Sequence, residues 1–156
     1  MKRIVIWCVG NPLMSDDGAG PALYSLLQGI LPPHIEGVNC ETTPENWISP
    51  LKKNPPSLLI IADGADMNLP YGALRRMTLP DRENLSFGTH GIPLSLLLAP
   101  LSGSFAVLAA AVQPKIRGFG MTLSPEVEEG VSRLAHILRE ERWMDLDPYQ
   151  ENLSPR

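Results

Sequence analysis

Apolar residues gather in short runs along the chain, and these runs alternate with stretches whose apolar positions follow helical spacing. The runs over 4–9, 58–62 and 105–112 are almost continuously apolar, which is typical of parallel strands covered on both faces. Two weaker segments, 37–41 and 72–78, predict a short second strand and an edge strand. The predicted helices cover 18–27, 43–53, 91–101 and 124–142.

Strands that alternate with helices indicate an α/β fold. We expect a three-layer, doubly wound, mostly parallel five-stranded sheet with helices on both faces. The length of 156 residues suits a single domain over 1–156, with a loose tail after about residue 143. In such sheets, ligands bind beyond the carboxyl ends of the strands, so the residues that follow each strand are the first candidates for a site.

Two polar residues are placed to cap helices. Asp16 precedes the helix predicted over 18–27, and the simplest interpretation is that its carboxylate accepts hydrogen bonds from the first turn. Ser124 stands before Pro125 at the start of the last helix, where serine caps and proline tolerates the first helical position. Both positions are therefore predicted to be structural.

Composition narrows the classes of function. The chain is 44% apolar and 19% charged, close to the globular average, and its net charge of −4 without a basic stripe argues against nucleic-acid binding. No segment approaches the ~20 apolar residues of a membrane span, and we expect a cytoplasmic protein. Cys8 and Cys40 lie in apolar surroundings, which predicts free, buried thiols.

Two acidic positions follow predicted strands, and a histidine precedes a predicted helix. Asp17 lies in the loop after the first strand, Asp63 directly follows the strand over 58–62, and His90 comes just before the helix over 91–101. If the two strands are neighbours, the carboxylates converge and the imidazole could reach them. Carboxylate oxygens with one imidazole nitrogen suit zinc or nickel better than calcium.

Each of these residues also has a simpler explanation. Asp17 could be a solvated acid in the first turn of a helix, and Asp63 could cap a turn with Gly64. A lone histidine in a loop, such as His90, is more often a surface residue than a ligand. Spacing alone leaves these alternatives open.

A nucleotide site is the natural competitor, because a glycine after the first strand followed by a helix is the plan of a dinucleotide-binding fold. Gly10, Gly18 and Gly20 do not follow the G-x-G-x-x-G spacing, and Pro12 removes an amide donor. The paired acids at 16 and 17 also place negative charge where a phosphate would bind. The loop therefore favours a cation.

Several short motifs stand out along the chain. The first is GNPLMSDDGAGP over 10–21, with its paired acids after Gly-Asn. It is followed in order by PEN at 44–46, LLIIADGADM at 58–67, THGIPL at 89–94 and VQP at 112–114. Together these motifs resemble those of the hydrogenase maturation endopeptidases, most of all the hydrogenase 3 (formate hydrogenlyase) type, and the resemblance covers roughly residues 4 to 140.

The resemblance implies a protease that removes the C-terminal extension of a nickel-iron hydrogenase large-subunit precursor after nickel insertion. The bound nickel is the recognition element and is carried by the precursor, and no organic cofactor is implied. The family's metal-contacting residues fall on Asp17, Asp63 and His90, and Asp17 and Asp63 are the candidate catalytic carboxylates in a family classified as aspartic-type. The partner is the precursor, with no nucleic acid or membrane, and the protein is expected to be a monomer.

Two questions stay open at this point. Either the metal polarises the scissile carbonyl or a water, or nickel only positions the substrate while Asp17 or Asp63 acts as general base. The alternative function is a non-catalytic nickel-centre chaperone that binds the precursor without cutting it. The polar segment over 79–87 precedes His90 and is predicted to flank the site and contact the precursor.

Overall fold

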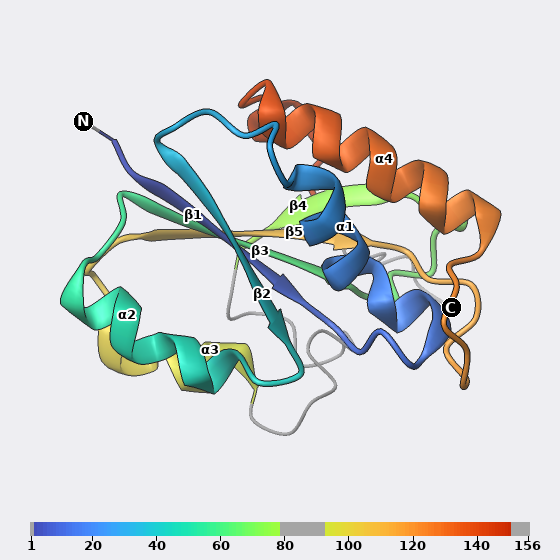
Figure 1. Cartoon of the computed structure of the whole chain (residues 1–156), viewed down its shortest axis with the longest axis horizontal. Coiled ribbons are helices and arrows are strands. Elements are labelled where there is room, and N and C mark those ends of the chain that lie inside the picture. Colours follow the sequence, from blue (N-terminus) through green and yellow to red (C-terminus); the bar gives the residue numbers. More distant parts are fainter. Residues whose placement is uncertain (1, 79–92, 151–156) are drawn as a thin grey trace.

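The structure, a computed structural model, describes residues 2–78 and 93–150. Its strands are β1 (Ile4–Val9), β2 (Ile35–Glu41), β3 (Leu58–Gly64), β4 (Leu74–Met77) and β5 (Ala106–Val112). Its α-helices are α1 (Ala19–Leu27), α2 (Ile48–Lys53), α3 (Leu94–Leu98) and α4 (Pro125–Arg139) (Figure 1). Short 3-10 turns are η1 (Ser15–Gly18), η2 (Pro44–Trp47), η3 (Ala99–Leu101) and η4 (Trp143–Asp145).

The five described strands form one mostly parallel sheet in the order β2-β1-β3-β5-β4. β1 pairs in parallel with β2 on one side and with β3 on the other, and β3 pairs in parallel with β5. Only β4, at the end of this order, runs antiparallel to its neighbour. Strand order therefore reverses at β1, so the carboxyl ends of β1 and β3 flank the switch point where ligands bind in such folds.

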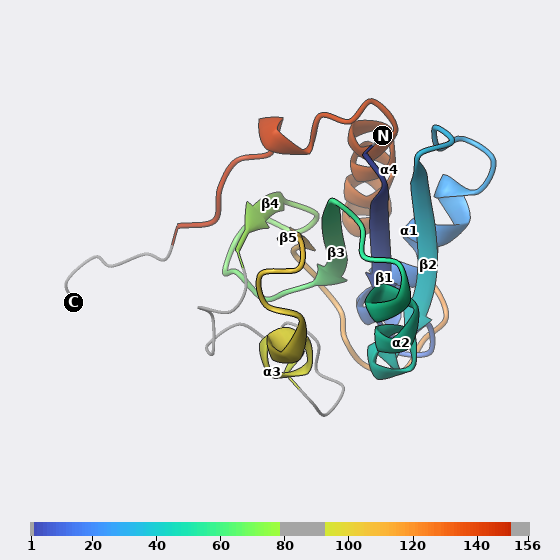
Figure 2. The same ribbon diagram turned by 90° about the vertical axis from the view of Figure 1, so that its left-hand side faces the viewer.

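Helices cover both faces of the sheet, with α1 and α4 on one side and α2 and α3 on the other (Figures 1 and 2). Alternate residues of each strand point to opposite faces. Ile4, Ile6 and Ile60 accordingly belong to the core cluster that includes residues of α1 and α4. Val5, Trp7, Leu59 and Ile61 belong to the cluster that includes residues of α2 and α3. The predicted three-layer, doubly wound sheet is confirmed.

The central strands explain why the strongest predictions were correct. The predicted runs over 4–9 and 58–62 form β1 and most of β3, where nearly every side chain is buried. The run over 105–112 forms β5 although three consecutive alanines favour a helix, because β5 is paired on both edges and its alanines are buried between layers. The weak segment over 72–78 contains β4. The beginning of the helix predicted from residue 91, and the predicted loop over 79–87, lie outside the described residues.

The prediction of a loose tail after residue 143 is wrong as far as Tyr149. The Arg76 amide donates to the Asp147 carbonyl, and the Tyr149 amide donates to the Arg76 carbonyl, at 2.9 and 2.8 Å. Leu146 is buried, and its carbonyl accepts a hydrogen bond from Arg76 Nε. The segment thus lies along β4 and satisfies backbone groups of that strand, which polar composition alone does not reveal.

Cys8 and Cys40 are free and buried, as predicted. Burial raises the pKa of the Cys8 thiol to about 12. Burial is also the larger cause of the raised pKa of Cys40, and electrostatic repulsion from Cys8 is the smaller one. Both thiols are therefore protonated at neutral pH, which makes them poor nucleophiles. Among the described helices, none is long and apolar enough to cross a membrane.

The N-terminus of α1 approaches β1 so closely that it requires glycine. A Cβ atom at Gly20, the second residue of α1, would collide with the carbonyl oxygen of Val9, and one at Gly10 would collide with that of Asp17. Gly10 also has a φ of +151°, which other residues rarely adopt. These contacts bring the loop between β1 and α1, with its acids, to the end of the sheet.

We predict that Gly20→Ala destabilises the protein by about 2 kcal/mol, because the helix must move away from β1. The direction opposes intrinsic propensity, which favours alanine over glycine within a helix by about 1 kcal/mol. Urea unfolding followed by circular dichroism measures the change. Gly37→Ala is the control, since a Cβ atom there would meet only side chains of Leu31 and Tyr24 at 3.6 and 3.8 Å. Equal unfolding midpoints for both variants would contradict the role of Gly20.

Candidate active site

The turn that carries Asp16 and Asp17 lies directly against the end of β3. The Asp16 carbonyl oxygen is 3.5 Å from the position that a Cβ atom would take at Gly64, the last residue of β3. In the sequence, Asp17 directly follows Asp16, and Asp63 directly precedes Gly64. The structure therefore places the turn that carries Asp17 against the end of β3, where Asp63 lies, at the switch point between β1 and β3.

The sequence suggested that Asp16 caps α1, but the structure shows that its side chain joins two loops instead. Its side chain is fully buried and accepts hydrogen bonds from the amides of Lys115, Ile116 and Ser124 at 2.9, 2.8 and 2.7 Å. The Ser124 hydroxyl donates a fourth bond, at 2.8 Å. Ser124 does stand at the N-cap position of α4, but its side chain makes no capping bond there because it is bound to Asp16 instead.

These four bonds determine the ionisation of Asp16. Burial by itself raises the pKa of the carboxyl group, because it penalises the charged form. The hydrogen bonds from Ile116, Ser124 and Lys115 outweigh burial and leave the pKa below its ordinary value. Asp16 is consequently an anion at neutral pH whose negative charge is balanced by backbone donors, and it is a structural group.

Asp17 forms an ion pair with Arg117. The Arg117 guanidinium Nε donates to Asp17 Oδ1 at 2.9 Å. The Asp17 side chain is 15% exposed and the Arg117 side chain 30%. Arg117 comes from the loop after β5, which the bonds to Asp16 hold in place. Asp17 is thus oriented by a cation and remains reachable from solvent, unlike its neighbour Asp16.

Asp63 is buried at the end of β3, with 4% of its surface exposed. Its Oδ1 accepts a hydrogen bond from the Gly64 amide at 2.7 Å, which is the turn contact that the simpler interpretation of this residue anticipated. This bond orients the carboxylate without precluding a second role. Asp63 therefore fits both the structural and the functional interpretation.

His90 lies outside the described residues, so its place relative to Asp17 and Asp63 stays a prediction. Within 2–78 and 93–150, no three His, Cys, Asp or Glu side chains are grouped to hold a metal ion. The described part of the candidate site accordingly consists of Asp17 with its arginine partner and of Asp63 at the end of β3.

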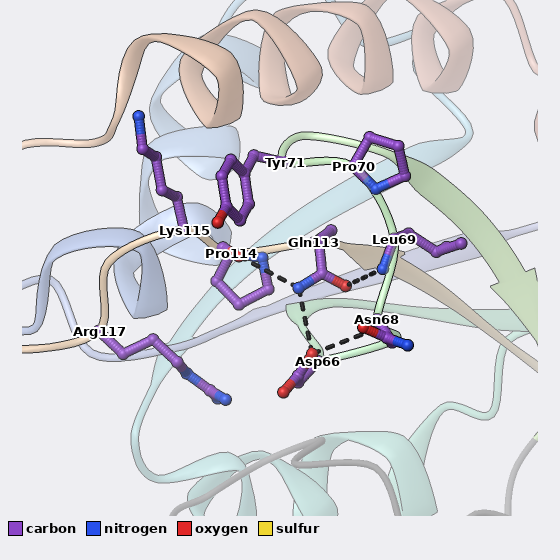
Figure 3. A pocket seen from close by; sticks show the side chains of 9 residues that line it. All are labelled: Asp66, Asn68, Leu69, Pro70, Tyr71, Gln113, Pro114, Lys115 and Arg117. Atoms are coloured by element: carbon purple, nitrogen blue, oxygen red, sulfur yellow. Dashed lines mark hydrogen bonds between the residues drawn. The ribbon is translucent and has the colours of Figure 1, made fainter.

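An open groove of about 480 Å³ adjoins this pair, between the loops that follow β3 and β5 (Figure 3). Its lining is formed by Asp66, Asn68, Leu69, Pro70, Tyr71, Gln113, Pro114, Lys115 and Arg117. Gln113 joins the two loops: its Oε1 accepts from the amides of Met67 and Leu69, and its Nε2 donates to Asp66 Oδ1. Arg117 belongs both to the groove and to the ion pair with Asp17, so the two are continuous.

Sequence reasoning missed three contributors to the site. Gln113 stood in the motif VQP over 112–114 and directly after a buried strand, but it was not selected as a site residue. Arg117 and the structural role of Asp16 had no sequence signal, because their partners lie 100 residues or so away in the chain. Only the folded chain brings the loop after β5 to the turn after β1.

The chain is similar to known proteins over most of its length. A family model described as hydrogenase maturation protease (HycI) matches residues 25–141. The hydrogenase 3 maturation protease of Escherichia coli (strain K12) is 32% identical over 129 residues, which are 81% of this chain and 83% of that protein.

Solved structures agree with this similarity. The solution structure of the endopeptidase HycI from Escherichia coli matches with a TM-score of 0.84 and 27% identity, covering 97% of this chain and 99% of that one. The crystal structure of the NiFe hydrogenase maturation protease HycI from Thermococcus kodakarensis KOD1 matches with a TM-score of 0.81, over 90% and 92% of the two chains. The second match, at 23% identity, shows the fold alone.

We predict that Asp16→Asn destabilises the fold by on the order of 3 kcal/mol. The asparagine side chain would direct an NH2 group, a donor, toward N–H and O–H donors of the loop after β5, so buried donors would lose their acceptor. Chemical denaturation measures the loss. Asp145→Asn is the matched control, because Asp145 is exposed and its ion pair with Arg142 is of the kind that contributes less than about 1 kcal/mol. A loss in Asp16→Asn no larger than in the control would contradict the tethering role of Asp16.

Proposed function

The chain belongs to the hydrogenase maturation protease family, and from this premise we propose that it removes the C-terminal extension of a nickel-iron hydrogenase large-subunit precursor after nickel insertion. The observation that supports the proposal is the close approach of the turn carrying Asp17 to the end of β3, next to Asp63, at the switch point of the sheet. Two strand-end carboxylates beside an open groove suit a site that receives both a metal centre and a peptide segment.

In this proposal, nickel is cargo of the precursor and is held there by cysteines. Asp17, Asp63 and His90 contact the nickel and thereby report that it has been inserted. Asp17 is suited to this role because its carboxylate is charged, partly exposed and already paired with a cation, Arg117. A metal centre that reaches Asp17 Oδ1 competes with the guanidinium for that oxygen.

The hydrolysis requires one water and one proton acceptor. The water oxygen bonds to the scissile carbonyl carbon, the peptide C–N bond breaks, and the leaving amine takes up a proton. We assign the acceptor of the water proton to one of the two carboxylates, Asp17 or Asp63, while nickel positions the scissile bond. The protein acts as a monomer in the cytoplasm, on a protein partner rather than on nucleic acid or a membrane.

We expect the purified protein to shorten the nickel-loaded precursor and to leave the nickel-free precursor intact. Mass spectrometry of the large subunit after incubation measures this. Cleavage of the nickel-free form would contradict the recognition of nickel. Stable binding of the loaded precursor with no change in its mass would instead favour the non-catalytic chaperone.

Asp17→Asn, Asp63→Asn and His90→Gln should each lower the cleavage rate at least about 100-fold, the scale on which acid–base groups contribute. Unchanged circular dichroism spectra would show that the variants fold. Asp145→Asn, which removes an exposed carboxylate of η4, should cleave like the wild type. Full activity in all three site variants would exclude the site.

A further inference from the structure

The loop after β5 carries the most exposed large apolar side chains of the described chain. Phe119 and Met121 are 91% and 81% exposed, and Ile116 of the same loop is 53% exposed. Leu13, from the loop after β1, is also 53% exposed. Single exposed apolar residues are ordinary, but a group of them on one side of a candidate site indicates an interaction surface.

These four residues come from two segments that run side by side. The Gly120 amide donates to the Leu13 carbonyl at 3.0 Å, and the Ser15 amide donates to the Gly120 carbonyl at 2.8 Å. The Asp16 amide donates to the Ile116 carbonyl at 2.9 Å. Leu13, Ile116, Phe119 and Met121 therefore form one group, which we call the apolar rim.

The rim is held in place before any partner arrives. In addition to the backbone bonds, the Ser15 hydroxyl donates to the Gly118 carbonyl at 2.8 Å, and the Asp16 carboxylate holds both ends of the loop through Lys115, Ile116 and Ser124. Gly120 leaves no room for a side chain, because a Cβ atom there would lie 2.6 Å from Ser15 Oγ. A preformed loop loses less conformational entropy on binding than a flexible one.

The rim is continuous with the site. Ile116 adjoins Arg117, whose guanidinium binds Asp17, and Leu13 precedes the turn that carries Asp17. A macromolecule that presents a metal centre to Asp17 therefore comes close to the segments that carry these side chains. Two cations lie beside the rim in the chain, but Lys115 is paired with Glu126 and Arg117 with Asp17. Because their charges are already balanced, they offer little attraction to an anionic lipid surface, which favours a protein as the partner.

We propose that the apolar rim is the docking surface for the folded hydrogenase large-subunit precursor, with Phe119 and Met121 as its anchors. This inference rests on the proposed function and adds the surface by which the substrate is held while its metal centre reaches Asp17. Interface energy is concentrated in a few large apolar or aromatic side chains, and Phe119 has the largest exposed fraction among the large apolar side chains of the described residues.

The test is the double variant Phe119→Ser with Met121→Ser, assayed with the nickel-loaded precursor. We expect KM to rise at least about 10-fold with kcat within about 2-fold of the wild type, because the substitutions touch docking and not the carboxylates. The matched control is Leu26→Ser with Ile30→Ser, which removes two exposed apolar side chains at the far end of α1 and beyond it. A KM equal to that of the wild type in the rim variant would overturn the proposal.

Failure of the proposed function gives a separate result. If the wild type leaves the loaded precursor uncut, binding to the intact precursor is measured by biolayer interferometry. An affinity at least about 10-fold weaker in the rim variant than in the wild type would support the rim, whereas equal affinities, or no binding at all, would overturn it. Sedimentation velocity of the wild type and of the rim variant completes the test. If the wild type forms dimers and the rim variant does not, the rim is a contact between copies of this chain, and the proposal is overturned.

Discussion

A single buried carboxylate, that of Asp16, joins the two loops from which the candidate site is built. Its three backbone partners and the Ser124 hydroxyl all lie in the segment between β5 and α4. Such a charge is tolerable only because every donor is in place, since a buried carboxylate without partners is strongly unfavourable. The position of Arg117, and through it the orientation of Asp17, depends on this arrangement.

The sheet determines where that arrangement lies. Because β1 pairs with β2 on one side and β3 on the other, the carboxyl ends of β1 and β3 flank the switch point of the sheet, where ligands bind in such folds. Gly10 and Gly20 let the turn with the paired acids approach the end of β1, and Gly64 at the end of β3 faces the Asp16 backbone. Close backbone approach is thus what brings the turn with Asp17 to the end of β3.

The loop after β5 contributes to two different properties of the protein. Its inner side supplies the amides that bind Asp16 and the guanidinium that orients Asp17. Its outer side presents Phe119 and Met121 to solvent. A loop that is rigid for one purpose is also preorganised for the other, which links recognition of a protein partner to the geometry of the carboxylates. Arg117 also lines the groove between the loops that Gln113 joins (Figure 3).

The sequence by itself determined the class of fold and pointed to two candidate site residues. Buried parallel strands must be apolar throughout, so β1, β3 and β5 were visible as runs, and Asp17 and Asp63 stood out as acids near their ends. Only the tertiary structure decided that Asp16 is a buried tether instead of a cap, that Arg117 pairs with Asp17, and that residues up to Tyr149 follow β4. These depend on partners distant in the chain, and local pattern carries information about burial and turn geometry but not about which loops meet.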